Sequence, residues 1–200
     1  MSQPRKRPRQ QRATATWAAI LDAAAQLFQT HGYTATTTNR VAERAGVSIG
    51  SLYQYFPNKD ALLLALAERH IGQAVGLLAE VFAELEQHRP NLENTLNRLI
   101  DTAVTLHEAD PAMHRLLFDQ TPRSPETAVA LRRLETLMAS AVAAQLRRLG
   151  VGGRHSETRA LLLVQGLEAQ VHGAVLTPSA TERSEVVAEM KAMWLAALGT

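Results

Sequence analysis

Two short motifs of this 200-residue chain contain residue types that could carry out catalysis or bind a metal. Residues 46–50, GVSIG, fit the G-x-S-x-G pattern that presents a nucleophilic serine at a strand-to-helix turn. A helical pattern precedes Ser48 and no strand is evident, so we expect no hydrolase. His107-Glu108 opens like a zinc-protease H-E-x-x-H motif, but the next histidine is His114 and Pro111 intervenes. Because the chain also lacks cysteine, we expect no metal site, no cofactor and no enzyme activity.

The segment 37–56, TTNRVAERAGVSIGSLYQYF, indicates a different chemistry. Its apolar residues are spaced to pack inward from two short helices, predicted over 38–45 and 48–55, with a turn at Gly46. Such a helix-turn-helix leaves the start of its second helix, Ser48 to Ser51, free to enter the major groove of DNA. The expected capping residues Thr38, Ser48 and Asn58 mark helix N-termini whose N–H groups suit phosphate oxygens.

The elements that position this segment are all predicted to be helices, since apolar residues repeat at helical spacing and no alternating β-branched run is evident. A first helix should end at His31-Gly32, and a long helix should follow Asn58 and continue towards His88. Beyond Pro90, helices are predicted over 92–108, 111–119, 125–149, 157–176 and 181–198. The predicted fold class is therefore all-α, with a three-helix front domain on a helical body.

Charge separates the same two parts of the chain. Residues 1–60 hold eight basic and three acidic side chains, whereas the remaining 140 residues hold 13 basic and 16 acidic ones. A basic front end points to a polyanionic partner. The arm 1–12, MSQPRKRPRQQR, is predicted to be disordered, either following a minor groove or only solubilising the chain. No apolar run approaches the roughly 18–20 residues of a membrane span, so a cytoplasmic protein without a membrane partner is expected.

Over about residues 14–74 the chain resembles the TetR-type transcriptional regulators. The resemblance rests on FQTHGYTATTT at the end of the first helix and on VAERAGVSIGSLYQYFPNKDALL after it. It implies a helix-turn-helix domain at 13–73 and an effector-binding and dimerisation domain at 74–200. Carried over by position, the implied DNA contacts are Thr38, Asn39, Arg40, Ser48, Ile49, Gly50, Ser51, Tyr53, Tyr55 and Lys59.

Roles within this set also follow from the resemblance. Ile49, Gly50 and Ser51 would face bases, while the two tyrosines and Lys59 would reach phosphates. Ile49 can offer a thymine methyl group an apolar contact but no hydrogen bond. Spacing alone leaves open that the tyrosines pack under the helix and that Lys59 is a solvated charge.

A two-fold DNA site needs a two-fold protein, so we expect a homodimer. The last two helices are the predicted interface, through small residues such as Gly166, Ala169 and Gly173 and through an apolar stripe from Val186 to Leu198. The alternative is that this stripe closes the core of the monomer. In the family an effector pocket lies among the fourth to eighth helices, and its candidates here are His107, Met113, His114, Leu117, Phe118, Met138, Gln165, Glu168 and His172.

Together these features predict a sequence-specific transcriptional regulator that binds a double-stranded DNA operator as a homodimer. We expect a repressor that a small, mostly apolar effector releases from its operator. The alternative is an architectural DNA-binding dimer that responds to no effector.

Overall fold

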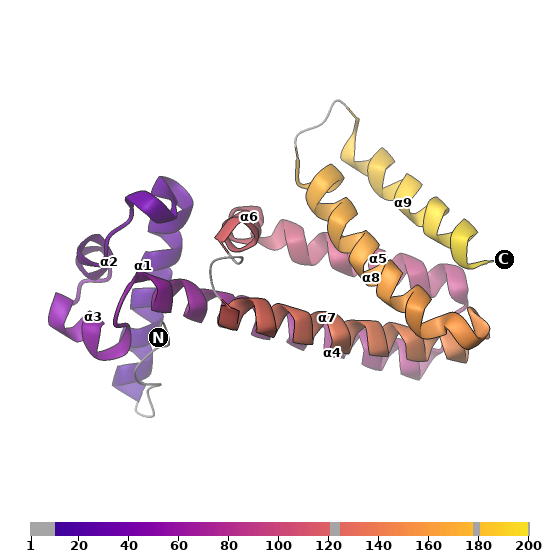
Figure 1. Ribbon diagram of the computed structural model, residues 1–200, viewed down its shortest axis with the longest axis horizontal. Coiled ribbons are helices and arrows are strands. Elements are labelled where there is room, and N and C mark those ends of the chain that lie inside the picture. The colour runs from indigo at the N-terminus through magenta and orange to yellow at the C-terminus, as the bar shows by residue number, and fades with distance from the viewer. Residues whose placement is uncertain (1–10, 121–124, 178–180, 200) are drawn as a thin grey trace. The chain divides into compact units, whose positions relative to one another are not determined.

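The computed structural model describes residues 11–120, 125–177 and 181–199. All elements of these residues are helical, without a strand (Figure 1), which confirms the all-α class. In chain order they are α1 Gln11–Ala35, α2 Thr38–Arg44, α3 Ile49–Tyr55, α4 Lys59–His88, α5 Leu92–Ala109, α6 Pro111–Gln120, α7 Pro125–Arg148, the 3-10 helix η2 Gly153–His155, α8 Ser156–Gln170, the π-helix η3 Val171–Val175 and α9 Arg183–Leu198.

The helices gather into two compact units. The first, here the front unit, comprises the described residues of Met1–Gly72 together with those of Ala112–Ala130. The second, here the body unit, comprises Gln73–Pro111 and the described residues of Leu131–Thr200. Each unit has its own apolar core, and the two cores are described separately below.

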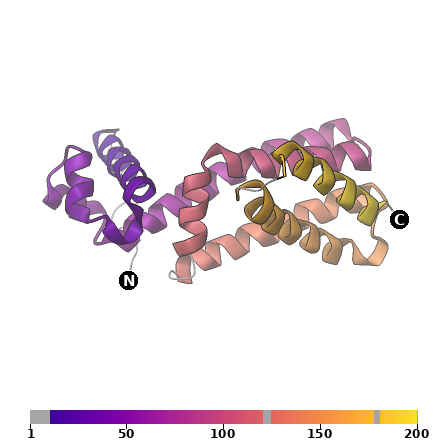
Figure 2. The ribbon, with the colours of Figure 1, turned by 90° about the horizontal axis from the view of Figure 1, so that it is seen from above.

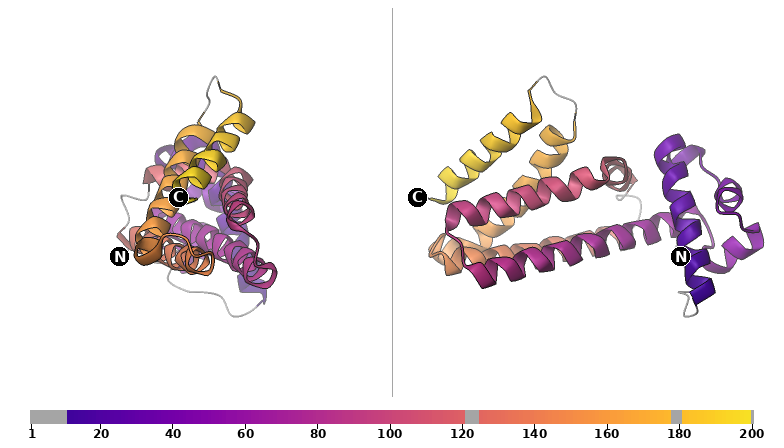
Figure 3. Two further views of the ribbon diagram at one scale, coloured as in Figure 1. Left: turned by 90° about the vertical axis from the view of Figure 1, so that its right-hand side faces the viewer. Right: turned by 180° about the vertical axis from the view of Figure 1, so that it is seen from behind.

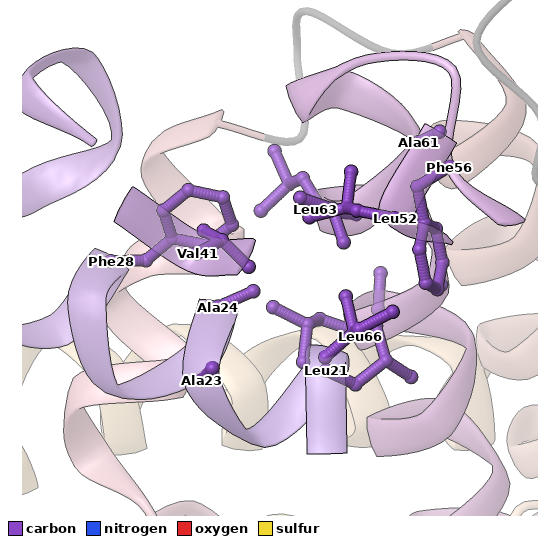
Figure 4. Packing of buried hydrophobic residues seen from close by; sticks show 14 of the residues in the cluster. Leu21, Ala23, Ala24, Phe28, Val41, Leu52, Phe56, Ala61, Leu63 and Leu66 are labelled. Carbon is purple, nitrogen blue, oxygen red and sulfur yellow. The ribbon is translucent and has the colours of Figure 1, made fainter. Parts of the chain in front are cut away.

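The front unit is built around the face of α1 that the apolar spacing predicts. Ile20, Ala24 and Phe28 are almost fully buried, and they meet Leu52 of α3 and Phe56 just beyond it. Figure 4 shows Ala24, Phe28, Leu52 and Phe56 of this group converging with Val41, Leu63 and Leu66 from the neighbouring helices. Burial of each large apolar side chain stabilises the fold by about 1.5–3 kcal/mol. The two short helices are therefore held in place by α1 and the start of α4.

The chain reverses at the end of α1 as the sequence predicts, but the cap of the next helix differs from the prediction. Gly32 interrupts the helical backbone with φ 78°, a left-handed conformation that favours glycine. The N-cap of α2 is Thr37, not the predicted Thr38, since Thr37 has an extended backbone and its Oγ1 accepts the Arg40 N–H at 3.3 Å. Thr36 is buried and donates its hydroxyl to the Gly32 carbonyl instead.

Other helix ends agree closely with the sequence. Ser48 is the N-cap of α3, as predicted, and the Asn58 Oδ1 accepts the Ala61 N–H at 2.9 Å at the start of α4. The predicted disordered arm 1–12 extends two residues too far, because α1 already begins at Gln11. The rest of that arm, residues 1–10, lies outside the described residues.

The body unit has a core of its own that α5 organises. Asn91 caps α5, and its buried residues Leu96, Ile100 and Val104 recur at helical spacing along one stripe. These side chains pack with residues of α4, α7, α8 and α9. Figures 2 and 3 show α9, in yellow, lying beside α5 and the end of α8 within this unit.

Much of the predicted dimer stripe closes this core. Met190 and Leu198 are buried, and Trp194 packs against the core while donating its indole N–H to the Gln170 Oε1 at 2.9 Å. Gly166, predicted to let two subunits approach, faces the Trp194 ring within one chain. A Cβ atom on Gly166 would lie 2.5 Å from the Trp194 Cζ2. Most of the stripe therefore packs in the core of a single chain, which was the alternative to a dimer interface.

Helix α4 is long and apolar enough, by length and composition, to cross a membrane. An 18-residue window in it has a mean hydropathy of 1.3, so the prediction that no run approaches a membrane span was wrong. The reason is that Glu68 and Arg69 are the only charged residues between Ala61 and Leu78. A core helix of a soluble protein passes the same test, and 44% of the window is buried.

The close contact between Gly166 and Trp194 can be tested with two matched substitutions. Gly166→Ala should lower the free energy of unfolding by up to about 2 kcal/mol, because overpacking costs about 1–3 kcal/mol and the gain in helix propensity offsets about 1 kcal/mol. Gly76→Ala is the control, since Gly76 is exposed on α4 with open space around its Cβ position, and it should stabilise by about 0.4–1 kcal/mol. Urea denaturation measures both variants. Equal stabilisation by both would contradict the packing described here.

Candidate functional site

The outer face of α3 is held out for contact by a cap and by buried neighbours. The Ser48 Oγ accepts the Ser51 N–H at 3.0 Å and lies 2.8 Å from the Ser51 Oγ. Leu52, one helical turn after Ser48, is fully buried and fixes the rotation of the helix. Ile49, with 37% of its surface exposed, and Gly50 consequently face solvent. A Cβ atom on Gly50 would meet only the Ser48 Oγ, at 3.8 Å.

The same cap defines the chemistry of Ser48. A helix, α2, precedes it, and its hydroxyl oxygen accepts a backbone N–H of the helix that follows. This is the geometry of a helix cap and not of a strand-to-helix nucleophile turn.

The two predicted tyrosines differ in position. Tyr53 is 40% exposed, and its hydroxyl lies 3.0 Å from the Thr38 Oγ1, which joins α3 to the start of α2. Tyr55 is half-buried and meets the Trp17 ring edge-on at a centroid distance of 5.9 Å. Tyr53 therefore lies on the outer face, whereas the ring of Tyr55 belongs to the packing of the front unit.

Polar and basic side chains border this face on α2. Asn39 and Arg40 are exposed, and Thr38 is half-buried beneath the Tyr53 hydroxyl. Together with Ile49 and Gly50 they form a surface of hydroxyls, an amide, a cation and one apolar side chain, here called the α2–α3 face. Such a set can contact phosphates and base edges at the same time.

Lys59 has internal partners that the sequence did not reveal. Its ammonium donates to the backbone carbonyls of Tyr33 at 2.6 Å and Thr34 at 3.2 Å. It also lies 4.3 Å from the centroid of the Tyr33 ring, a cation–π distance. Lys59 thus fastens the start of α4 to the end of α1, close to the turn that Gly32 makes.

In the body unit, three of the predicted effector residues form one cluster. The His107 Nε2 and the His172 Nε2 each lie 3.2 Å from a carboxylate oxygen of Glu168. The two imidazole rings meet edge-on at a centroid distance of 4.9 Å. The i, i+4 spacing of Glu168 and His172 is visible in the sequence, but the approach of His107 from α5 is not.

The charges and hydrogen bonds of His107, Glu168 and His172 shift the pKa values of His107 and Glu168. Burial of the His107 ring opposes its charging, yet the hydrogen bond and the negative charge of Glu168 outweigh this and raise the pKa of His107. Burial alone would raise the pKa of Glu168, but hydrogen bonds from His107 and His172 and their charges hold that pKa well below its usual range. Glu168 is therefore ionised at neutral pH.

Each of the remaining effector candidates with a described side chain has neighbours in its own unit. Met113 and Leu117 are buried in the core of the front unit, where the Nε2 atoms of His114 and His70 are 2.8 Å apart. In the body unit Met138 packs against the core, and the Gln165 side chain donates to Glu135 at 2.6 Å. The side chain of Phe118 lies outside the described residues.

A groove of about 450 Å³ lies along the end of α8, η3 and α9. None of the nine predicted effector residues lines it. Its lining combines apolar and acidic side chains: Gln170, Ala174, Thr181, Glu185, Val186, Glu189, Met190 and Met193. The sequence offered no signal for it, because the apolar spacing of its α9 residues equally indicates a dimer stripe.

Comparisons with known proteins match both units. Residues 20–66 match the family model described as bacterial regulatory proteins, tetR family, and residues 91–198 match the one described as tetracyclin repressor-like, C-terminal domain. The transcriptional activator FasR of Mycolicibacterium smegmatis is 32% identical over 100 residues, which are 50% of this chain and 44% of FasR. Across FasR and seven other curated relatives, the matched region covers between 22% and 64% of the relative's length.

Solved structures share the fold over nearly the whole chain. A TetR transcription regulator from Haloarcula marismortui superposes with a TM-score of 0.73 at 18% identity, over 92% of this chain and 97% of that one. SmeT, the repressor of the Stenotrophomonas maltophilia multidrug efflux pump SmeDEF, gives a TM-score of 0.64 at 25% identity, over 93% and 91%.

The internal bonds of Lys59 predict an effect on stability. Lys59→Met should lower the free energy of unfolding by about 1–3 kcal/mol, because hydrogen bonds from a charged donor to two carbonyls are lost. Arg40→Met, which removes an exposed cation from α2, is the control and should change stability by less than about 0.5 kcal/mol. Chemical denaturation of both variants gives the comparison. An unchanged Lys59→Met variant would mean that the two carbonyl contacts contribute nothing to stability.

Proposed function

The chain belongs to the tetR family of bacterial regulatory proteins, and we propose that it is a homodimeric repressor that a small, mostly apolar effector releases from operator DNA. The front unit binds the operator, and the body unit dimerises and binds the effector. Because its target is DNA, the proposed place of action is the cytoplasm. Relatives include the activator FasR and the repressor KstR2. Repression is proposed because a dimer on an operator can block a promoter without further components.

The observation that carries the DNA-binding proposal is the α2–α3 face. The buried side of α3 is anchored by Leu52, so the opposite side presents Ile49 and Gly50 at the start of a helix, where a helix-turn-helix protein reads the major groove. Tyr53 and Arg40, at the border of this face, are the proposed phosphate contacts. Ser51 remains a proposed base contact, although its hydroxyl also lies against Ser48.

The proposed dimer uses the part of α8 that the monomer core leaves exposed. Leu162 is 56% exposed, and Gln165, Ala169 and Gly173 continue the same exposed side of the helix towards η3. Leu161 and Met193, 38% and 49% exposed, adjoin it. Large apolar side chains beside small residues allow two helices to approach closely and to bury apolar area on association.

The effector proposal rests on the lining of the body unit and on its relatives. The described groove has a volume within the range of about 300–1,000 Å³ that small-molecule sites show, and its lining is mainly apolar. SmeT, which shares the fold, has been solved in complex with triclosan, a small molecule. Effector and operator must weaken each other's binding by the same factor, since coupling between two sites is reciprocal.

Gly50→Leu tests the DNA-binding face without disturbing the fold. The leucine side chain would project from α3 into solvent, where only the Ser48 Oγ is near, so the variant should be at least as stable as the wild type. Affinity for a duplex selected by the wild-type protein from random sequences should fall at least about tenfold, because the side chain blocks close approach to base edges. A gel-shift titration measures this. Gly76→Leu on α4 is the control, and equal affinity of all three proteins would refute the assignment of α3 as the reading helix.

Leu162→Glu tests the dimer. A carboxylate at the centre of the proposed interface would be buried without a partner, so the variant should sediment as a monomer where the wild type sediments as a dimer. Leu137→Glu on α7 is a matched control, since Leu137 is equally exposed at 56%. Sedimentation velocity distinguishes the species. A Leu162→Glu variant that remains dimeric would exclude this side of α8 as the interface.

A further inference from the structure

The cluster of His107, Glu168 and His172 presents its polar atoms towards one point in the body unit. His107 lies near the end of α5, whereas Glu168 and His172 are one helical turn apart on α8 and η3, and all three residues belong to the body unit. The side chains of His107 and His172 are only 8% and 14% exposed, while that of Glu168 is 57% exposed. Solvent therefore reaches the cluster from the side of the carboxylate.

The hydrogen-bonding groups around His107 require either a proton or a metal ion between His107 and Glu168. Its Nδ1 lies 2.7 Å from the Ala103 carbonyl oxygen, which can only accept, so Nδ1 carries a proton. In a neutral imidazole the Nε2 is then a lone pair, and it faces a Glu168 carboxylate oxygen at 3.2 Å. Two acceptors at this distance repel unless a proton or a metal ion lies between them.

The hydrogen bond from the His107 Nδ1–H to the Ala103 carbonyl is also typical of metal-binding histidines. A histidine that binds a metal through one ring nitrogen generally donates its other N–H to a carbonyl or a carboxylate, which fixes the ring. His107 has this arrangement through Ala103, with Nε2 directed at Glu168.

The distances within the cluster match a coordination shell. Zinc binds imidazole nitrogen and carboxylate oxygen at about 2.0–2.2 Å, so two ligand atoms of a tetrahedral site lie about 3.3 Å apart. The His107 Nε2 lies 3.2 Å from the Glu168 Oε2 and the His172 Nε2 lies 3.2 Å from the Glu168 Oε1, so an ion between the rings would meet both carboxylate oxygens. One ring nitrogen of His107 lies within 4.8 Å of one of His172.

The backbone at His172 is a second feature of this cluster. His172 belongs to the π-helix η3, in which the Leu176 N–H reaches the Val171 carbonyl at 2.9 Å, five residues back. Such wide turns are rare inside α-helices, and η3 is instead the last turn of the helix that carries Glu168, so it sets how this helix ends at His172. Here the π turn begins directly after the helical turn that carries Glu168.

We propose that His107 Nε2, the Glu168 carboxylate and His172 Nε2 bind a divalent transition-metal ion, for which Zn²⁺ is the reference. Two imidazoles and one carboxylate suit zinc, nickel or copper and not Mg²⁺ or Ca²⁺, which prefer oxygen ligands. Three protein ligands leave a fourth position for water or another donor, in the pattern of open zinc sites. This site goes beyond the proposed regulatory function and does not depend on it.

Zinc binding by the full-length protein tests the proposal. The protein is treated with a chelator, dialysed, and titrated with Zn²⁺ at neutral pH in competition with a chromophoric zinc indicator. The wild type should bind one ion per chain, and millimolar Mg²⁺ should not displace it. Glu168→Gln and His172→Gln should each lose at least about tenfold in affinity, because loss of even an outer partner of a metal ligand costs about 10- to 100-fold.

Controls separate this site from other histidines. His155→Gln on η2 and His88→Gln at the end of α4 remove exposed histidines and should bind zinc like the wild type, as should His70→Gln, which removes one member of the His70–His114 pair. Far-UV circular dichroism confirms that each variant is folded. Absence of saturable binding would mean that a proton alone bridges the cluster. Unchanged affinity of the Glu168 and His172 variants would place the ion elsewhere, and either result overturns the proposal. The titration contains no DNA, so its outcome is independent of operator binding.

Discussion

The burial of Leu52 and Phe56 is the constraint on which the front unit depends. Helix α3 has seven residues, and isolated helices shorter than about 12–15 residues are marginal in water. Its stability must therefore come from tertiary packing, and both side chains are fully buried against α1. Since these two residues are one helical turn apart, they also fix the rotation of α3. The exposure of Ile49 and Gly50 is a consequence of that packing.

The body unit shows how one apolar stripe can serve two demands. Most of the apolar residues of α9 are used within the chain, through Trp194 over Gly166 and through buried Met190. What remains for a second subunit is a narrower set of exposed side chains, mainly on α8. The width of an apolar stripe therefore does not show how much of it lies in a dimer interface. Packing in the monomer core and packing against a second subunit give the same sequence pattern.

The sequence was sufficient where the signal is local. Helix periodicity, the glycine at position 32 and the caps Ser48 and Asn58 each depend on a few neighbouring residues, and the structure confirms them. Three successive threonines gave no local basis for preferring Thr37 over Thr38. The choice depends on Thr36, whose hydroxyl is bound to carbonyls of α1.

Contacts between distant segments could not be predicted in the same way. The partners of Lys59 are backbone carbonyls that become available only where Gly32 ends the regular helix. Every residue has a backbone carbonyl, so the sequence does not indicate which ones will accept a hydrogen bond. The histidine cluster was recognised only as separate polar residues. Its members come from helices far apart in the chain, and the scarcity of metal-binding residue types argued against a metal site.

The π turn at Val171–Val175 fixes the number of residues in this part of the chain. A π turn holds one residue more than an α turn, and each residue of an α-helix advances about 100° around the axis. Deleting Val171 would allow a regular α-helix, but it would move His172 from four to three residues after Glu168 and so rotate this one side chain by about 100° around the axis. Homologues that keep the side chains but lose this single residue would bring the histidine to the carboxylate from the other side of the helix face, at i,i+3 instead of i,i+4. Chain length at this turn, and not only residue identity, therefore distinguishes relatives that share the cluster from those that do not.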